Sequence, residues 1–167
     1  IWSMYEIDID LPYSSEMVVL NNKIYRIGGG LALWEYCPVT DVWTQRANML
    51  SYRTDFSAWA HDGRIWIAGG LDDWALPMNT TAVYDSVTDT WTEDDAVFAF
   101  LPEGAFGAGD AVVGDAFVML GCQDYDILSF NYTYSGKVLV YNPALNQWGY
   151  DCEIPIPMDF VEADSIG

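Results

Sequence analysis

Ile65–Gly70 (IWIAGG) and, further along, Tyr84–Trp91 (YDSVTDTW) form a pattern that occurs three times in this chain of 167 residues. In each copy an apolar run ends in small residues, and a tyrosine then precedes a tryptophan by seven positions. The small residues are Gly28 with Gly29, Gly69 with Gly70, and Gly121 with Cys122; the aromatic pairs are Tyr36 with Trp43, Tyr84 with Trp91, and Tyr141 with Trp148. A unit that recurs as a whole predicts an architecture of repeated supersecondary structures.

The secondary structure expected of each unit is a set of four short antiparallel strands. Segments of alternating polarity, rich in Val, Ile and aromatic residues, are separated by Gly, Asn and Asp turns, and no long segment has helical periodicity. In the second unit the predicted strands are Asp55–His61, Arg64–Gly69, Thr81–Tyr84 and Thr90–Val97. The first hairpin of each unit closes with a residue pair that tolerates positive φ: Asn21-Asn22, Asp62-Gly63 and Gly114-Asp115.

A four-stranded unit with a two-glycine strand end and this tyrosine-to-tryptophan interval resembles the kelch repeat. The resemblance implies an all-β fold, a β-propeller, in which four-stranded blades surround a channel lined by the first strand of each. It also implies that the glycine pairs allow close backbone approach and that the tyrosine and tryptophan rings fill the space between neighbouring blades. Cys122 replaces the second glycine of the third unit, which leaves the local backbone conformation open there.

The chain is expected to be one partial propeller of about three blades. Trp2 precedes Pro12 by ten positions, as Trp43 precedes Arg53 and Trp148 precedes Met158, so the repeat extends into both ends. The predicted divisions are the last strand of a preceding blade (1–11), three blades (12–50, 51–101 and 102–157) and the start of another (158–167). Since closed propellers have about four or more blades, this chain alone is not expected to close a ring. Either it belongs to a longer polypeptide, which we favour, or a second copy completes it.

The composition is apolar and strongly acidic. An apolar content of 51% provides for a sizeable core, and no apolar run approaches the length of a membrane-spanning helix. Against 25 acidic residues stand 6 basic ones, a formal charge of -19 that disfavours nucleic acid and anionic membranes as partners. We interpret the charge mainly as a determinant of solubility, with attraction of cations or of a basic protein as the alternative.

Two asparagines fit the N-x-Thr acceptor motif for N-linked glycans, Asn79 and Asn131. Both lie between the second and third strands of their units, at equivalent surface positions in successive blades. Glycosylation at these residues would place the protein in the secretory route, outside the cell or on its surface. The alternative is a cytoplasmic protein in which both motifs are coincidental.

Acidic residues gather in the loops that are expected at the same end of the blades. They are Asp72, Asp73, Asp124 and Asp126 in two long loops and Glu103 in a connection between blades. The favoured interpretation is a solvated loop surface, and the alternative is a site for Ca²⁺ or a basic partner, because Ca²⁺ takes several carboxylate and carbonyl oxygens. No contiguous spacing resembles a known calcium loop. We therefore expect no resident cofactor or metal.

The three cysteines allow one candidate disulfide. Cys122 and Cys152 belong to the same blade, but they follow strands two apart, which is too far for a bond unless the loop brings Cys122 closer. Cys37 lies at the opposite end of its blade and is expected to be a small buried or free thiol.

Nothing in the sequence indicates catalysis. His61 is the only histidine and flanks a hairpin turn, and no nucleophile motif is present. Galactose-oxidase-like copper enzymes also resemble kelch propellers, but their copper takes two histidines with two tyrosines, which this chain cannot supply. Arg53, at a junction between blades, is interpreted as a donor to backbone carbonyls or to an acidic neighbour.

The function predicted from the sequence is therefore a non-enzymatic protein-binding or structural assembly module of a secreted or cell-surface kelch-repeat glycoprotein. Its partners would be proteins, including other copies or the rest of a longer chain. The long loops Leu71–Thr80 and Gln123–Gly136 would provide specificity, because the strands are committed to packing. The alternatives are part of a copper enzyme with its metal ligands on missing blades, and a cytosolic kelch adaptor.

Overall fold

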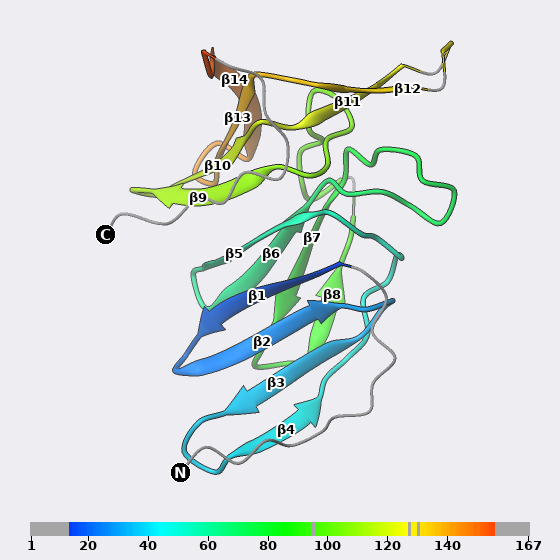
Figure 1. The fold of residues 1–167 in the computed structure, drawn as a ribbon. Helices are drawn as coiled ribbons and strands as arrows, with labels where there is room; N and C mark the ends of the chain where they lie inside the picture. Colours follow the sequence, from blue (N-terminus) through cyan, green and yellow to red (C-terminus); the bar gives the residue numbers. More distant parts are fainter. Residues whose placement is uncertain (1–13, 95, 127, 130, 156–167) are drawn as a thin grey trace.

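The computed structural model describes residues 14–94, 96–126, 128–129 and 131–155. These residues form fourteen β-strands, and none of them is in a helix (Figure 1). It follows that no helix in these ranges could cross a membrane. The stubs predicted at 1–11 and 158–167 lie outside the described residues.

The strands form three antiparallel sheets of four, which we call the first, second and third blades. The first has the order β1 (Ser15–Leu20), β2 (Lys23–Gly28), β3 (Leu33–Cys37), β4 (Val42–Gln45); the second β5 (Ser57–His61), β6 (Arg64–Ala68), β7 (Thr81–Asp85), β8 (Thr90–Thr92). The third has the order β9 (Gly109–Val113), β10 (Ala116–Leu120), β13 (Lys137–Asn142), β14 (Gln147–Glu153). Between β10 and β13 the chain makes a two-stranded ribbon of β11 (Gln123–Asp126) and β12 (Asn131–Tyr134). The predicted fold class is confirmed.

The blades stand side by side and do not close a ring within the described residues (Figure 1). Their first strands, β1, β5 and β9, are neighbours in that order. One buried cluster fills the space between the first and second blades and includes Tyr25, Ile27, Tyr84 and Trp91. A second cluster, between the second and third blades, includes Tyr141 and Trp148 and is centred on Trp59 stacked against Phe117, with ring centroids 4.8 Å apart.

Two details of the predicted strands are wrong. The last strand of the second blade ends at Thr92 rather than Val97, because Asp94 starts a turn in which its side chain accepts the backbone N–H of Ala96. The inner strand β5 begins at Ser57 rather than Asp55, and Asp55 has a positive φ of 52°. The tight turns occur where predicted, with left-handed backbone at Asn21, Asn22, Asp62, Gly63 and Gly114.

The paired glycines lie where one blade approaches the next. Gly69 has φ +68°, and a Cβ there would lie 2.2 Å from the carbonyl oxygen of Ala105, at the start of the third blade. The backbone N–H of Gly70 donates to that same oxygen at 2.7 Å. In the third unit Gly121 has φ +70°, whereas the φ of Cys122 is not positive. A cysteine is therefore tolerated in the second glycine's place.

Acidic side chains also gather on the inner strands. Burial, with the nearby carboxylates of Asp110 and Asp55, raises the pKa of Glu16 on β1 to about 7, and burial raises the pKa of Asp110 on β9 to about 6. A carboxyl whose pKa is higher in the folded state than in the unfolded state stabilises the fold at low pH, and this stabilisation is lost as the pH rises through the folded pKa. Ionisation of Glu16 and ionisation of Asp110 therefore both lower the free energy of unfolding as the pH rises from 5 to 8.

We expect the free energy of unfolding to fall by about 2 kcal/mol or more between pH 5 and pH 8. Urea unfolding at the two pH values measures it. Glu16→Gln should remove much of this difference, because glutamine does not ionise. The exposed Asp73→Asn is the matched control and should leave it in place. An unchanged pH dependence in Glu16→Gln would contradict the assignment.

Candidate protein-binding face

The two long connections predicted to carry specificity meet on one side of the molecule. Residues 71–78 follow β6 in the second blade, and the β11–β12 ribbon follows β10 in the third, so they are equivalent connections of successive blades. Figure 1 shows both extending from the sheets on the same side. The hydroxyl of Tyr132 donates to the backbone oxygen of Ala75 at 3.0 Å and joins them. We call the surface formed by residues 71–78, 123–126, 128–129 and 131–134 the loop face.

The ribbon has two different faces. Its register sets Tyr125 opposite Tyr132 and Gln123 opposite Tyr134, so the tyrosines share one face, whereas Asn131 lies on the other. The rings of Tyr125 and Tyr132 lie 5.0 Å apart, and Tyr132 also makes an edge contact at 5.2 Å with the buried ring of Phe106. The tyrosine side of the ribbon is therefore anchored to the third blade.

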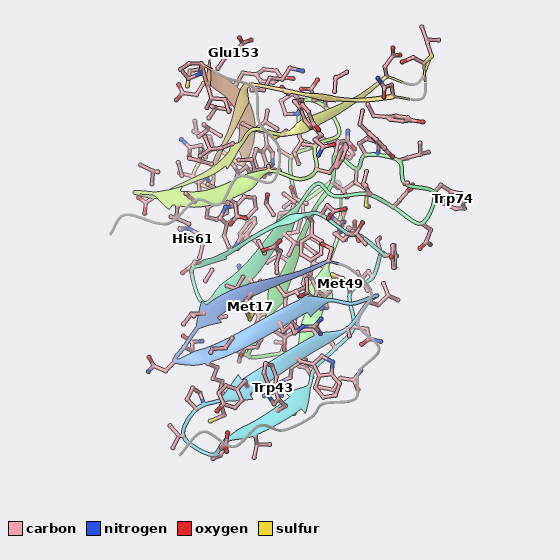
Figure 2. All side chains as sticks on the ribbon, in the orientation of Figure 1. Met17, Trp43, Met49, His61, Trp74 and Glu153 are labelled. Carbon is pink, nitrogen blue, oxygen red and sulfur yellow. The ribbon has the colours of Figure 1, made fainter. Side chains whose placement is uncertain are left out.

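The loop beside the ribbon presents a tryptophan on an ordered turn. The carboxylate of Asp72 accepts the backbone N–H of Trp74 at 2.8 Å and that of Leu76 at 2.9 Å, and Ala75 adopts a positive φ of 57°. Trp74 is 80% exposed and lies at the outer end of its loop (Figure 2). Tyr134 on the ribbon is 61% exposed, and Leu128 at the ribbon tip is exposed as well. A hydrogen-bonded turn thus holds the Trp74 ring in contact with solvent.

Comparison with known proteins shows similarity to kelch-repeat proteins. The model of the Kelch motif matches residues 52–93, which span the second blade. Kelch-like protein 15 from Danio rerio is 26% identical over 92% of this chain, and Kelch-like protein terF from Aspergillus terreus is 29% identical over 90%. Residues 52–93 thus match the Kelch motif, and the chain is similar to kelch-repeat proteins over most of its length.

The kelch relatives are longer than this chain, which covers 29% of the first protein and 36% of the second. An F-box/kelch-repeat protein from Arabidopsis thaliana, At4g39560, is 27% identical over 81% of this chain and 48% of its own length. Among solved structures, YjhT superposes with a TM-score of 0.70 at 19% identity, covering 87% of this chain and 54% of YjhT. That likeness shows a shared fold.

Three of the acidic residues predicted to mark a loop surface or a cation site, Asp72, Asp126 and Glu103, make contacts within the chain. Asp72 fixes its own loop, and Asp126 accepts the N–H of Leu128 at 2.9 Å and the hydroxyl of Ser129 at 2.7 Å. Glu103 pairs with Lys137 at 2.6 Å. Asp73 is exposed, and Asp124 lies in β11 opposite Thr133. Within the described ranges no three His, Cys, Asp or Glu residues are placed to hold a metal ion, and Ca²⁺ binding stays a prediction.

The asparagines of the two glycan motifs are exposed. Asn79 precedes β7, and Asn131 opens β12 on the side of the ribbon away from the tyrosines. A glycan at Asn131 would therefore lie on the side of the ribbon opposite Tyr132 and Tyr134. Glycosylation itself stays a prediction.

The predicted disulfide is absent. Cys122 and Cys152 are not joined by a disulfide: Cys122 is buried, and Cys152 is exposed on β14, two strands away from β10 in the sheet order. The loop after β10 does not bring Cys122 to the edge strand, because it leads into the ribbon. Cys37 is a free, half-buried thiol at the end of β3.

The polar residues considered for catalysis have structural contacts. The ring of His61 makes an edge contact with Phe117 at 5.2 Å between the blades. Arg53 is buried and donates to the backbone oxygens of Gly69 at 3.0 Å and Thr80 at 3.3 Å, and it pairs with Glu93. Arg53 thus acts as interpreted from the sequence.

Sequence reasoning found the loops of the loop face but not its residues. Trp74 and the ribbon tyrosines were not singled out, although alternation in Asn131–Tyr134 (NYTY) is itself a strand signal. The contact between Tyr132 and Ala75 joins residues 57 positions apart and left no local signal.

Proposed function

We propose that this kelch segment is a non-enzymatic protein-binding module that contacts partner proteins through the loop face. The observation that carries the proposal is the link between Tyr132 and Ala75, which joins two long connections and holds exposed Trp74 and Tyr134 on a rigid sheet frame. Tryptophan and tyrosine dominate the binding energy of protein interfaces, because they bury large areas at low entropic cost.

The net charge of the protein indicates which kind of partner its surface attracts. Five of the six basic side chains pair with carboxylates inside the chain, namely Lys23, Arg46, Arg53, Arg64 and Lys137. With a formal charge of -19, the surface field is negative and favours encounter with proteins whose contact surface is basic. Similarity to Kelch-like and F-box/kelch-repeat proteins supports a role in protein interaction.

The cellular location proposed is the secretory route, on the strength of the two exposed acceptor asparagines, Asn79 and Asn131. The alternative, a cytosolic kelch adaptor, agrees with the loop face equally well. An intact mass that enzymatic deglycosylation leaves unchanged, after production in a glycosylating host, would favour the alternative.

Replacing both exposed rings tests the binding proposal. We expect Trp74→Ala combined with Tyr134→Ala to weaken capture of partner proteins by about tenfold or more, because each aromatic anchor contributes on the order of 1–2 kcal/mol. The measurement immobilises each protein and quantifies by mass spectrometry the partner proteins that it retains. Neither ring is in the core, so the urea midpoint should stay the same.

The matched control is Val39→Ala combined with Val87→Ala. Both valines are exposed in the hairpins β3–β4 and β7–β8, at the opposite end of the blades from the loop face. The control should retain the same partners as the parent protein. Equal retention by all three proteins would rule out the loop face as the binding surface.

A further inference from the structure

The β11–β12 ribbon has an edge strand. β11 follows β10, β12 runs into β13, and β14 pairs with β13 on the side away from β10, so the ribbon extends beyond the sheet of the third blade (Figure 1). Within the described residues the β14 ladder ends in a bond from the N–H of Ile154 to the oxygen of Gly136 at 2.6 Å. Pro155 follows and has no N–H with which to extend the ladder. Among the described strands β12 therefore pairs with β11 alone.

The hydrogen bonds of the ribbon show which backbone groups of β12 point outward. The N–H of Ser135 donates across the ribbon to the oxygen of Cys122 at 3.0 Å. In an antiparallel pair the backbone groups of successive residues point alternately toward the partner strand and away from it. Tyr134 and Tyr132 precede Ser135 by one and three positions, so their N–H and C=O groups point away from β11.

Two neighbouring bonds agree with this alternation. Gln123 lies opposite Tyr134, and its N–H donates away from β12, to the oxygen of Phe106 at 2.9 Å. Gly136, two positions after Tyr134, accepts its bond from β14 on the outer side of the hairpin. Among the described residues no backbone group bonds to the outward N–H and C=O of Tyr132 and Tyr134. These four groups form an open edge.

β12 also lacks the features that usually protect such an edge. Edge strands in native proteins carry lysine, proline or a bulge, or are covered by another segment, because unpaired backbone groups invite a further strand. The sequence of Asn131–Tyr134 (NYTY) contains neither lysine nor proline, and its register with β11 runs without a shift. All four residues are exposed. The strand is thus built in a form that can pair with another chain.

Charge indicates which chain it would accept. Asp126 lies opposite Asn131 at the outer end of the ribbon, and Glu153 lies at the end of β14, beside its base; both are exposed. The whole chain carries a formal charge of -19. A second copy would bring the same charge to the edge and be repelled, whereas a basic segment would be attracted.

We propose that β12 accepts an extended basic segment of a partner protein as a third strand of the ribbon, bonded to the outward backbone groups of Tyr132 and Tyr134. This inference rests on the proposed function and states how the partner meets the loop face. Side chains of an added strand alternate between the two sides of the ribbon, so apolar ones pack beside the tyrosine rings and basic ones lie on the side of Asn131 and Asp126. Main-chain bonds give such pairing its affinity, and alternate side chains give its specificity.

Amide exchange with a synthetic peptide tests strand addition in the unmodified protein. The probe is a short peptide of alternating valine and lysine with blocked ends, and the control peptide has glutamate in place of lysine. We expect saturating probe to slow exchange of the Tyr132 and Tyr134 amides by about tenfold or more, measured by nuclear magnetic resonance. Thr133 should change less, because its N–H bonds within the ribbon. The glutamate peptide should slow neither tyrosine amide, because its charge repeats that of the protein.

A pair of variants separates the main-chain bonds from the ring. Tyr134→Pro removes the outward N–H but no bond within the ribbon, and Tyr134→Ala removes the same ring while it keeps the N–H. We expect the proline variant to bind the lysine peptide about fivefold or more weakly than the alanine variant, because one hydrogen bond is lost. Isothermal titration calorimetry measures both affinities. Equal affinities would overturn strand addition.

The other outcomes are equally decisive. Unchanged exchange of the Tyr132 and Tyr134 amides with the lysine peptide would overturn the proposal, as would protection of both amides before any peptide is added, because the edge would already be occupied. A dimer that Tyr134→Pro dissociates would assign the edge to a second copy. Loss of partner capture in Trp74→Ala with Tyr134→Ala, without slowing by the peptide, would keep the loop face and reject strand addition. Slowing by the peptide with unchanged capture would support strand addition and reject the exposed rings as anchors.

Discussion

Gly69→Ala is expected to lower the free energy of unfolding by about 3 kcal/mol, because two costs add at this position. The backbone of Gly69 has φ +68°, a conformation that an L side chain adopts at a cost of about 1 kcal/mol. The new Cβ would also lie 2.2 Å from the oxygen and 3.2 Å from the carbon of the Ala105 carbonyl. Both atoms belong to the backbone, and the oxygen accepts the N–H of Gly70, so moving them apart from Gly69 would separate the second and third blades.

Gly63→Ala separates the two costs. Gly63 has φ +72° in the β5–β6 turn, and no atom lies within 4 Å of the position its Cβ would take. The expected loss is therefore the backbone cost alone, about 1 kcal/mol. Urea unfolding of both variants against the parent protein measures the difference. Equal losses would show that close approach of the blades does not explain the paired glycines.

How much of the structure the sequence predicts depends on how far apart in the chain the interacting residues lie. The tight turns, the glycine pairs and the Tyr-to-Trp interval are local and recur three times, so their pattern predicted the blades. A further local signal is the spacing of Asp41, Asp89 and Asn146, each of which follows the tyrosine of a Tyr-to-Trp interval by five positions. The spacing was visible, but its meaning required the contact with the preceding blade, 42 positions away for Asp89 and Ala47.

For the loop face, the sequence predicted the two long loops but not which of their residues lie together. Its β11–β12 ribbon forms because the tyrosines pair across the strands and pack on Phe106, and Asp72 is used by its own turn. Acidic residues in loops stay solvated at little energetic cost, and their carboxylates also accept backbone N–H groups in turns. Composition alone therefore could not distinguish a cation site from residues that stabilise turns.

Arg53 is the second position where a large effect is expected. Its buried guanidinium pairs with Glu93, and the carboxylate of Glu93 also accepts the hydroxyls of Ser51 at 2.6 Å and Thr80 at 3.0 Å. Arg53→Ala leaves this carboxylate without its cationic partner and the backbone oxygen of Gly69 without the guanidinium donor in a buried junction, whereas the oxygen of Thr80 keeps the N–H of Gly69. The expected loss is about 3–5 kcal/mol of unfolding free energy, measured by urea denaturation.

Two further variants test whether the loss of stability in Arg53→Ala comes from leaving a buried charge unpaired. One breaks an exposed ion pair, and the other replaces both residues of the buried pair. Arg64 and Asp85 pair at 3.4 Å with both side chains in contact with solvent, so Arg64→Ala should cost less than about 1 kcal/mol. Arg53→Met combined with Glu93→Leu removes both charges, and it should recover more than half of the loss in Arg53→Ala, since an apolar pair needs no donor. If the double variant is less stable than Arg53→Ala, the junction depends on hydrogen bonds to the backbone oxygens rather than on neutralising Glu93. In that case the role of Arg53 is to fasten Gly69 and Thr80 to the start of its own blade.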